Sequence, residues 1–358
     1  MPQPFLPGAF NSHLYSVAYA EFRLFTFFLY CKLILSITIA KNSLRSKNLK
    51  PEIVSAPKFK LIFFLPQYWL TWLSIILLYC ISWLPYRMQT LIGIGFGKLL
   101  KLLVKKRYQI ARRNLALCFP NLSEQQRQAI LDANLDCTGM AILEASMGWW
   151  WPTWRVQKVA EFEGYEHIEA ILAKGKGVLA YAIHNMNLEL AVRVAGLKNP
   201  SVAFYRKHNN SLMEYMQYHG RNKSNKYMVH KRDVQGLISA LNDGEVCFYL
   251  PDQDYGRKKC EFVPLFAVPE VATTTGSLLF AKEANCETVF IASLKTSSGY
   301  KIKVFPGLEN FPSGDDKRDV GRINQMVEKM IMIAPEQYLW MHKRFKTRPS
   351  PEDASLYD

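Results

Sequence analysis

The sequence lacks the cysteine patterns that form the disulfide bonds of small secreted domains or bind zinc. Its seven cysteines are scattered singly, with no CxxC pair among them, and their number is odd. These features exclude a disulfide framework and a zinc ribbon, and they favour a reducing compartment. Internal repeats and low-complexity segments are absent as well. With 49% hydrophobic and 21% charged residues among 358, the chain has enough apolar material for one large folded domain or two ordinary ones.

Acidic residues are also missing from a long stretch near the N-terminus. None occurs between Glu52 and Glu124, where the sequence has ten positive residues: Lys58, Lys60, Arg87, Lys98, Lys101, Lys105, Lys106, Arg107, Arg112 and Arg113. The whole chain has a formal net charge of +15, which suits a nucleic acid, an anionic lipid surface or an acidic protein. No RRM or zinc-finger spacing is present, so a non-catalytic basic binder is the less favoured alternative, and no nucleic-acid partner is expected.

Within that basic stretch, residues 61–86 carry no charge and read LIFFLPQYWLTWLSIILLYCISWLPY. The 18 residues from Gln67 to Leu84 lie between Pro66 and Pro85 and are just long enough to cross a bilayer as a helix. Aromatic residues at both ends are typical of the two water interfaces of a membrane. We therefore expect an N-terminal apolar membrane anchor that either spans the bilayer or lies in its interface. A buried core helix is the alternative.

Short apolar runs alternate with helical patterns in the remainder of the chain. Ser123 followed by Gln126 predicts a capping box that opens a helix through about Ser146, and residues 319–333 predict an amphipathic helix. Strands are predicted over residues 177–183, 201–205, 246–250, 288–294 and 300–305. This alternation indicates an α/β fold.

A histidine follows the first predicted strand and supplies the candidate chemistry. His184 precedes Glu189 by five residues, and on one continuous helix such residues point about 140° away from each other. The two can meet only if His184 lies on a strand-to-helix turn and Asn187 caps the helix, with Glu189 in its first turn. A histidine oriented by a carboxylate is a general base suited to acyl transfer. By itself, however, the spacing more often marks a histidine that caps a helix beside an acid.

Two further strand ends carry polar side chains. Arg206 closes one predicted strand, and Asp252, Asp254 and Tyr255 follow another. Ligands of open α/β sheets gather at the carboxyl ends of strands. Arg206 could bind phosphate, stabilise an oxyanion or form a surface ion pair. Asp252 and Asp254 could ligate a metal with His184, but no other acidic cluster completes a magnesium site, so no metal is expected.

Several ordered blocks are more specific than any single spacing. They read PQYWLTW, RNLALCFPNLSEQQR, HNMNLEL, YRKHNNSLMEY, GRNKSN, PDQDYG, FVPLFAVPEVATTTG and MIAPEQYLWMHKRFKTRP. With these blocks the chain, over roughly residues 60–350, resembles the bacterial lipid A biosynthesis acyltransferases, and most closely the late-acting ones. The resemblance implies a mixed sheet flanked by helices, as in glycerol-phosphate acyltransferases. It also implies a Gram-negative inner-membrane enzyme whose catalytic domain lies on the cytoplasmic face.

The resemblance further implies the reaction and its partners. A lauroyl or related chain would move from acyl carrier protein to the hydroxyl of a 3-hydroxyacyl chain on Kdo2-lipid IV-A. Acyl carrier protein and this acceptor are then the partners, anionic membrane lipids are the neighbours, and no cofactor is needed beyond the acyl donor. A lysophospholipid or glycerol-phosphate acyltransferase with the same histidine chemistry is the alternative.

The family's motifs also assign roles to individual residues by resemblance. Its HxxxxD/E pair is catalytic, so His184 matches the base and Glu189 the acid that orients it. Arg206 matches an arginine expected to contact the acceptor phosphate or the thioester oxyanion. The third block supplies the remaining substrate-binding candidates, namely Asp252, Asp254 and Tyr255.

These expectations divide the chain into four parts. Residues 1–56 form an extension outside the resemblance, whose apolar segment 24–40 is interrupted by Lys32 and does not read as a cleaved signal. Residues 57–113 form the membrane anchor and its basic flank. Residues 114–348 form the acyltransferase domain, and residues 349–358 are expected to be a loose tail.

Overall fold

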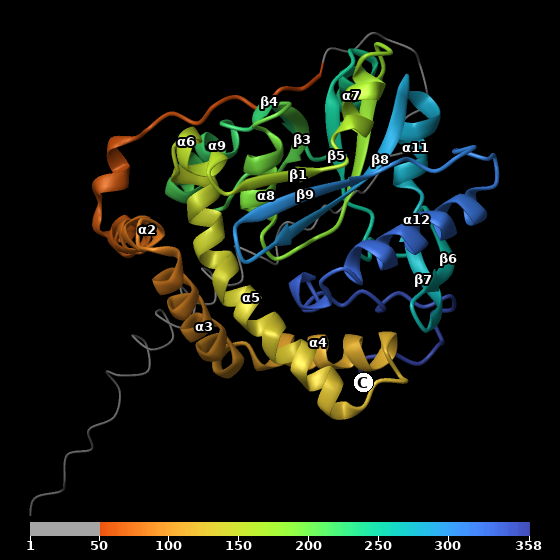
Figure 1. Cartoon of the computed structure of the whole chain (residues 1–358), viewed down its shortest axis with the longest axis horizontal. Helices are drawn as coiled ribbons and strands as arrows, with labels where there is room; N and C mark the ends of the chain where they lie inside the picture. The colour runs from red at the N-terminus through yellow and green to blue at the C-terminus, as the bar shows by residue number, and fades with distance from the viewer. Residues whose placement is uncertain (1–50) are drawn as a thin grey trace, which may run out of the picture. The chain divides into compact units, whose positions relative to one another are not determined.

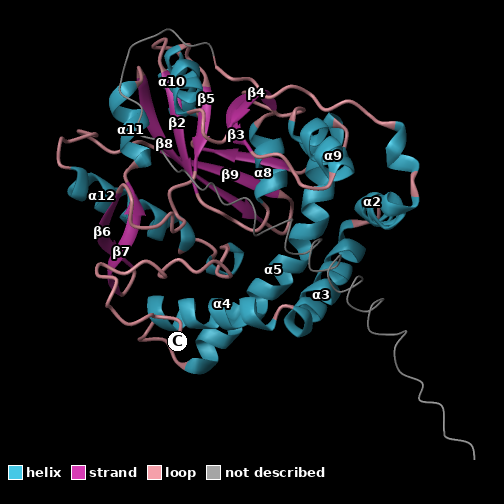
Figure 2. Ribbon diagram, turned by 180° about the vertical axis from the view of Figure 1, so that it is seen from behind, coloured by secondary structure: helices cyan, strands magenta, loops and turns pink. Residues whose placement is uncertain are grey.

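The computed structural model describes residues 51–358, so the apolar segment 24–40 lies outside the described residues. A seven-stranded sheet, shown in Figures 1 and 2, has the order β1-β9-β8-β2-β5-β3-β4. Its strands are β1 (Ala160–Glu163), β2 (Gly177–Ala182), β3 (Ser201–Tyr205), β4 (Asn225–His230), β5 (Val246–Tyr249), β8 (Cys286–Lys295) and β9 (Tyr300–Phe305). A separate antiparallel pair consists of β6 (Cys260–Leu265) and β7 (Val268–Thr274).

The directions of the strands confirm the expected mixed sheet. β8, β2, β5, β3 and β4 run parallel, while β9 is antiparallel to β8 and parallel to β1. All six residues of β2 are buried, as is typical of a parallel strand covered on both faces. Every predicted strand is present. The two unpredicted strands of this sheet, β1 and β4, are its edges, and their sequences AEFE and NKYMVH contain the polar residues that edge strands carry.

Helices connect and cover the strands. Around the sheet lie α6 (Thr153–Gln157), α7 (Glu166–Leu172), α8 (Leu188–Ala195), α9 (Ser211–Arg221), α10 (Val234–Asn242), α11 (Gly276–Glu283), α12 (Asp316–Ile331) and the 3₁₀ turn η3 (Pro335–Gln337). The N-terminal part comprises η1 (Leu61–Phe64), η2 (Pro66–Tyr68), α2 (Trp69–Ser82), α3 (Tyr86–Leu103), α4 (Lys105–Cys118) and α5 (Glu124–Trp150). The long helix α5 packs against α2, α3, α8 and α9 and so joins the N-terminal helices to the sheet.

Two local expectations for helix starts have different outcomes. The capping box of α5 is confirmed, because Ser123 and Gln126 bond each other's backbone N–H groups. Asn187 does precede α8, but its side chain makes no cap. Its Oδ1 instead accepts a hydrogen bond of 2.6 Å from the Ser293 hydroxyl on β8, so a tertiary contact replaces the expected local one.

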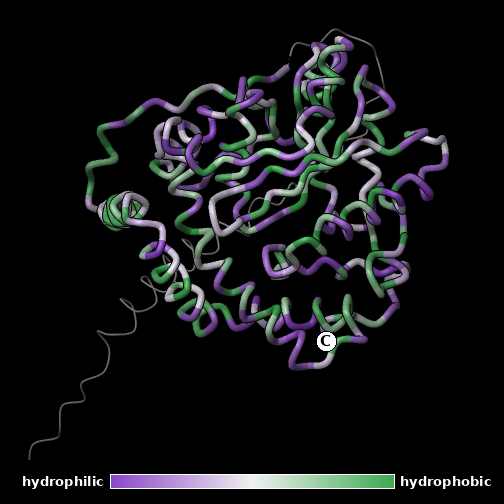
Figure 3. The backbone as a smooth tube through the Cα atoms, viewed as in Figure 1, coloured by the Kyte–Doolittle hydropathy of each residue, from purple (hydrophilic) through white to green (hydrophobic). Residues whose placement is uncertain are grey.

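The expected spanning anchor is wrong for the described residues, none of whose helices is long and apolar enough to cross a membrane. Pro66 and Pro85 do bracket the segment, but α2 contains only 14 residues. One side of this segment packs inward, since Phe63 is buried against Trp149 and Leu212. The opposite side exposes large apolar side chains from η1 to α3, and the tube of α2 is largely green in Figure 3.

Helices α3 and α5 lie side by side in Figures 1 and 2, in contact through glycines. A Cβ atom on Gly139 of α5 would collide with backbone atoms of Gly93 and Gly97 on α3. The absence of side chains at these positions therefore lets the two backbones approach closely. By contrast, Gly95 on the exposed side of α3 has open space around it.

The C-terminal residues are held in place, so the prediction of a loose tail past Arg348 is wrong. The Tyr357 hydroxyl donates to Asn114 Oδ1 at 2.6 Å and accepts from the Phe345 N–H at 3.0 Å. Arg113 Nε also donates to the carbonyl of Leu356. These bonds fasten the tail to α4, which itself runs across the boundary expected near residue 113.

Candidate active site

His184 lies just past the carboxyl end of β2, where the sequence predicted it. β5 pairs with β2 in parallel, so the loop after β5 brings Asp252 to the same edge of the sheet. Asp252 Oδ1 lies 2.7 Å from His184 Nδ1, and Asp252 Oδ2 accepts from the His184 backbone N–H at 2.8 Å. Both residues are buried, with exposed fractions of 5% and 1%. The carboxylate therefore fixes both the backbone and the ring of His184.

The charge state of Asp252 determines which imidazole nitrogen carries the proton. Burial alone would raise the pKa of Asp252, but its electrostatic interaction with His184 and the hydrogen bonds from that residue outweigh burial and lower that pKa. An ionised Asp252 can only accept, so Nδ1 of His184 carries the proton and donates it. In residues 51–358, no hydrogen bond occupies the other nitrogen, Nε2. The pair thus has the form of an oriented general base.

Glu189 does not hold the imidazole, which corrects the expected pairing. Its Oε2 accepts from Trp149 Nε1 at 2.8 Å and from Arg221 Nε at 3.1 Å, and its Oε1 forms an ion pair with Arg221 Nη2. The Glu189 and Arg221 side chains are only 13% and 16% exposed. Burial by itself raises the pKa of Glu189, but the charge and hydrogen bonds of Arg221 lower it overall. Glu189 therefore ties α8 to the ends of α9 and α5.

The C-terminal segment supports the site from the other side. The Leu339 N–H donates to the His184 carbonyl at 3.0 Å, and the Tyr338 hydroxyl donates to the Asp252 carbonyl at 3.2 Å. His342 accepts from the Asp254 N–H at 3.2 Å. Burial, followed by the electrostatic interaction with nearby His184, lowers the pKa of His342 to about 3, so this second imidazole is neutral. The QYLWMH block of the sequence thus positions the histidine and aspartate.

Asp254 and Tyr255 form hydrogen bonds that hold the loop after β5 together. Asp254 accepts from the Thr347 N–H and hydroxyl, both at 2.8 Å, and from the Gly256 N–H at 2.8 Å. The Tyr255 hydroxyl donates to the Leu250 carbonyl at 3.1 Å. That these two residues bind substrate stays a prediction. Among the described residues, no three His, Cys, Asp or Glu side chains gather as metal ligands.

Arg206 lies half-buried at the carboxyl end of β3, as predicted, and belongs to a positive cluster. Lys231 follows β4, and its N–H donates to the Tyr205 carbonyl at 3.0 Å. Burial, together with the charges of Arg206 and Arg232, lowers the pKa of Lys231. Mutual repulsion among three cations at the sheet edge makes this cluster suited to an anionic group.

Sequence reasoning missed three features of the site. It placed Asp252 among the substrate ligands, and it gave no role to Arg221, although the block GRNKSN contains it. It also gave no role to Trp149. The partner of Arg221 lies 32 positions away, so no local pattern marked this arginine.

Comparisons with known proteins show the family of this chain. Residues 56–347 match the family model of bacterial lipid A biosynthesis acyltransferases. The chain is 42% identical over 299 residues to the lipid A biosynthesis lauroyltransferase of Escherichia coli, covering 83% of this chain and 98% of that protein. It is 41% identical over 302 residues to the palmitoleoyltransferase of the same organism, covering 84% and 98%.

A more distant relative, the lipid A biosynthesis myristoyltransferase of Escherichia coli, is 27% identical over 300 residues, covering 83% of this chain and 93% of that protein. The family match extends over the helices before the sheet, the whole sheet and the C-terminal segment that supports His184. This chain therefore belongs to the bacterial lipid A biosynthesis acyltransferases and is an acyltransferase enzyme.

Proposed function

We propose that the protein transfers a fatty acyl chain from acyl carrier protein to the hydroxyl of a 3-hydroxyacyl chain on Kdo2-lipid IV-A. The buried His184–Asp252 pair, with Nε2 of His184 available as an acceptor, is the observation that carries the proposal. Two relatives are named lauroyltransferase and palmitoleoyltransferase. These names support a lauroyl or palmitoleoyl chain as the group transferred. The proposal needs no metal and no cofactor beyond the acyl donor.

In the proposed step, Nε2 of His184 takes the proton of the acceptor hydroxyl. At the same time, the oxygen of that hydroxyl forms a bond to the thioester carbonyl carbon. The carbon–sulfur bond then breaks, and the imidazolium returns the proton to the leaving thiolate. Asp252 stays ionised and stabilises the transient positive charge on the ring. No covalent acyl-enzyme is required.

Glu189 and Arg221 have a supporting role in this proposal. A buried ion pair that loses one partner leaves an uncompensated charge, so each residue requires the other. Because Glu189 lies on the first turn of α8, directly after the His184 loop, the pair fixes where that loop ends. Arg206 and its neighbours Lys231 and Arg232 supply positive charge for a phosphate of the acceptor or an acidic surface of the carrier protein.

In this proposal the chain lies on the surface of the membrane, on the cytoplasmic face of the inner membrane that the family resemblance implies. We call the outward side of η1, α2 and α3 the apolar helical face; its most exposed side chains are Leu61, Leu91, Leu102, Trp69 and Leu73. Exposed apolar surface of this extent suits burial at the boundary of headgroups and acyl chains. The basic residues that flank it favour anionic lipids.

Mass spectrometry of lipid products tests the reaction. Detergent-solubilised protein is incubated with Kdo2-lipid IV-A and acyl carrier proteins loaded with chains of different length, and the mass increment identifies the chain transferred. We expect His184→Ala to abolish the increment and Asp252→Asn to lower turnover about a hundredfold or more, because the ring loses its orientation and charge partner. His167→Ala, on α7 and outside the site, is the matched control.

The outcomes separate the candidate acceptors. Turnover retained by His184→Ala would contradict the mechanism. Transfer to a lysophospholipid or to glycerol phosphate, with none to Kdo2-lipid IV-A, would replace the acceptor while keeping the histidine chemistry. Thermal unfolding of each variant establishes that a lost increment reflects chemistry rather than a lost fold.

A further inference from the structure

The loop that leads from His184 into α8 is held by a residue of the neighbouring strand β8. Strands β2 and β8 pair in parallel, and the last residue of β2, Ala182, lies opposite Ile291. Two residues further along both chains, Ser293 of β8 is in register with His184. β8 continues there as the partner of β9, so Ser293 belongs to the sheet itself. A sheet residue that the sequence analysis did not single out thus lies beside the candidate base.

Ser293 forms two hydrogen bonds with this loop, one through its backbone and one through its side chain. Its carbonyl accepts from Asn185 Nδ2, and its hydroxyl donates to Asn187 Oδ1 at 2.6 Å. All three residues are buried. The other atoms of the two amides, Asn185 Oδ1 and Asn187 Nδ2, are buried without a hydrogen-bond partner among residues 51–358. Within the described chain, Ser293 therefore supplies the hydrogen bond that fixes each of these amides.

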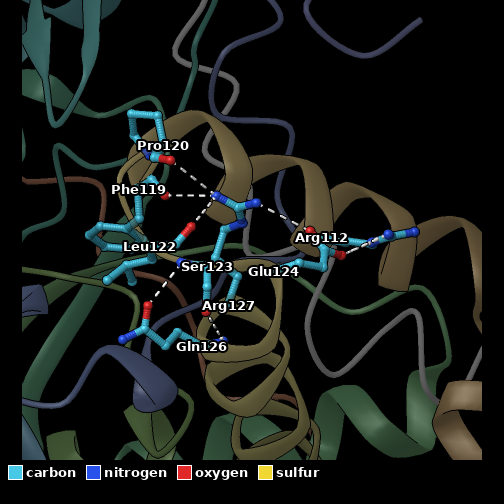
Figure 4. A network of polar contacts seen from close by, with 8 residues as sticks. All are labelled: Arg112, Phe119, Pro120, Leu122, Ser123, Glu124, Gln126 and Arg127. Atoms are coloured by element: carbon cyan, nitrogen blue, oxygen red, sulfur yellow. Dashed lines mark hydrogen bonds and ion pairs between the residues drawn. The ribbon is translucent and has the colours of Figure 1, made fainter.

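The bond to Asn187 replaces one that a residue in this position ordinarily makes. Asn187 directly precedes α8, where an asparagine side chain commonly accepts from the N–H groups of the first helical turn. Asn210 caps α9 in this way, and Ser123 caps α5 by accepting from the Gln126 N–H (Figure 4). The side chain of Asn187 instead leaves α8 uncapped and accepts from Ser293. Such exceptions to local preference are typical of functional sites.

The direction in which the His184 ring points depends on the chain that follows it. Asp252 accepts from the His184 N–H and lies at hydrogen-bond distance from Nδ1, and the Leu339 N–H donates to the His184 carbonyl. The bond at Nδ1 fixes one point of the imidazole, so the direction of Nε2 also depends on the path of the backbone. Ser293 fixes that path, because it holds both asparagines of the loop. A displacement of about 1 Å can lower the rate of a positioned reaction about a hundredfold.

We propose that Ser293 is a positioning residue for acyl transfer, which holds the loop after His184 so that Nε2 faces the acceptor hydroxyl. Ser293 acts through Asn187 and the loop, and not on the reacting atoms. The inference rests on the proposed function, because it takes His184 as the base of the transfer. Ser293→Ala isolates the role of the hydroxyl, since it keeps the backbone carbonyl that accepts from Asn185.

Kinetics of matched hydroxyl deletions test this role. The control is Tyr165→Phe, which also removes one buried hydroxyl that donates to an asparagine Oδ1, that of Asn199. Asn199 lies two residues before β3 begins, whereas His184 follows the carboxyl end of β2. We expect Ser293→Ala to lower kcat about tenfold or more, with KM changed less than about twofold, and Tyr165→Phe to keep both constants. Ser293→Thr, which keeps the hydroxyl, should recover most of the rate.

A second readout follows the imidazole itself and requires no turnover. Nuclear magnetic resonance of the detergent-solubilised full chain, labelled with isotope-enriched histidine, detects the ring nitrogens, and His184→Gln assigns the signals of His184. We expect Ser293→Ala to shift the His184 ring signals. Tyr165→Phe and Ser293→Thr should leave them at the wild-type positions. A general loss of stability would not produce this pattern, and thermal unfolding of each variant measures that loss separately.

The outcomes decide between a positioning role and a purely structural one. Unchanged kcat or unchanged ring signals in Ser293→Ala, or an equal loss of kcat in Tyr165→Phe, would overturn the inference. A raised KM with unchanged kcat would also overturn it, because that pattern belongs to a binding contact. Asn187→Ala removes the same bond from the loop side and replaces Ser293→Ala if that variant does not fold. If the wild type transfers no chain to Kdo2-lipid IV-A, the proposed function fails, while shifted ring signals still support the hold of Ser293 on the loop.

Discussion

The buried acidic residues of this protein differ in the direction of their pKa shifts, because their neighbours differ. Asp252 and Glu189 both have a lowered pKa, since His184 and Arg221 outweigh the cost of burial. Glu144, on α5, is buried, and its hydrogen-bond partner among residues 51–358 is a hydroxyl: Tyr300 donates to its Oε1 at 2.8 Å. Burial raises the pKa of Glu144 to about 7, against the opposing charge of Lys295. The ionised form of the Glu144 carboxyl therefore works against folding.

This raised pKa makes stability depend on pH in a defined direction. Between the ordinary pKa of 4.5 and the native value of about 7, the native state binds the proton more tightly than the unfolded state. The free energy of unfolding contributed by Glu144 therefore falls as pH rises through that window and stays low above it.

We predict that Glu144→Gln, which keeps the acceptor for Tyr300, is more stable than the wild type by about 2 kcal/mol at pH 8 and nearly equal to it at pH 5. Urea unfolding in detergent at the two pH values measures the difference. The exposed Glu169→Gln on α7 is the control. An equal stability difference at both pH values would contradict the assignment.

At the scale of elements, local patterns identified the interior of the fold and missed its edges. The central strands and α5 were predictable because their burial and capping appear directly in the residue pattern. Edge strands β1 and β4 are half exposed, and their polar residues interrupt the run of apolar residues that would predict a strand. The close approach of α3 and α5 was not predictable either, because it depends on glycines of two helices meeting in space.

That helix pair gives a prediction with an internal control. We expect Gly139→Ala to destabilise the protein by about 2 kcal/mol, because the new methyl group meets backbone atoms of α3 that cannot turn aside. Gly95→Ala, on exposed α3 surface with open space, should be neutral or stabilising by about 0.5–1 kcal/mol. Denaturant unfolding measures both. Equal gains at both positions would show that helix propensity, and not helix contact, determines the effect.

At the scale of the whole molecule, the described chain combines a buried catalytic pair with an exposed apolar surface. Ile76 on α2 and Met332 beside α12 are both 54% exposed. We predict that Ile76→Asp weakens binding to vesicles containing phosphatidylglycerol about tenfold or more, because the apolar helical face would bury a charge. Met332→Asp should leave vesicle binding unchanged. Co-sedimentation with vesicles measures both, and an equal loss for the two variants would exclude the apolar helical face as the attachment site.

The sequence by itself determined the class of fold, the central strands, the capped start of α5 and the place of His184 at a strand end. Each of these depends on neighbours within a few residues, so a local pattern reveals it. Only the tertiary structure decided which acid serves His184, because Asp252 lies 68 positions away and arrives through the parallel pairing of β5 with β2. It also decided how the apolar segment folds, since Phe63 docks against Trp149 and α2 ends after 14 residues. Long-range pairing and packing have no signature in a single stretch of chain.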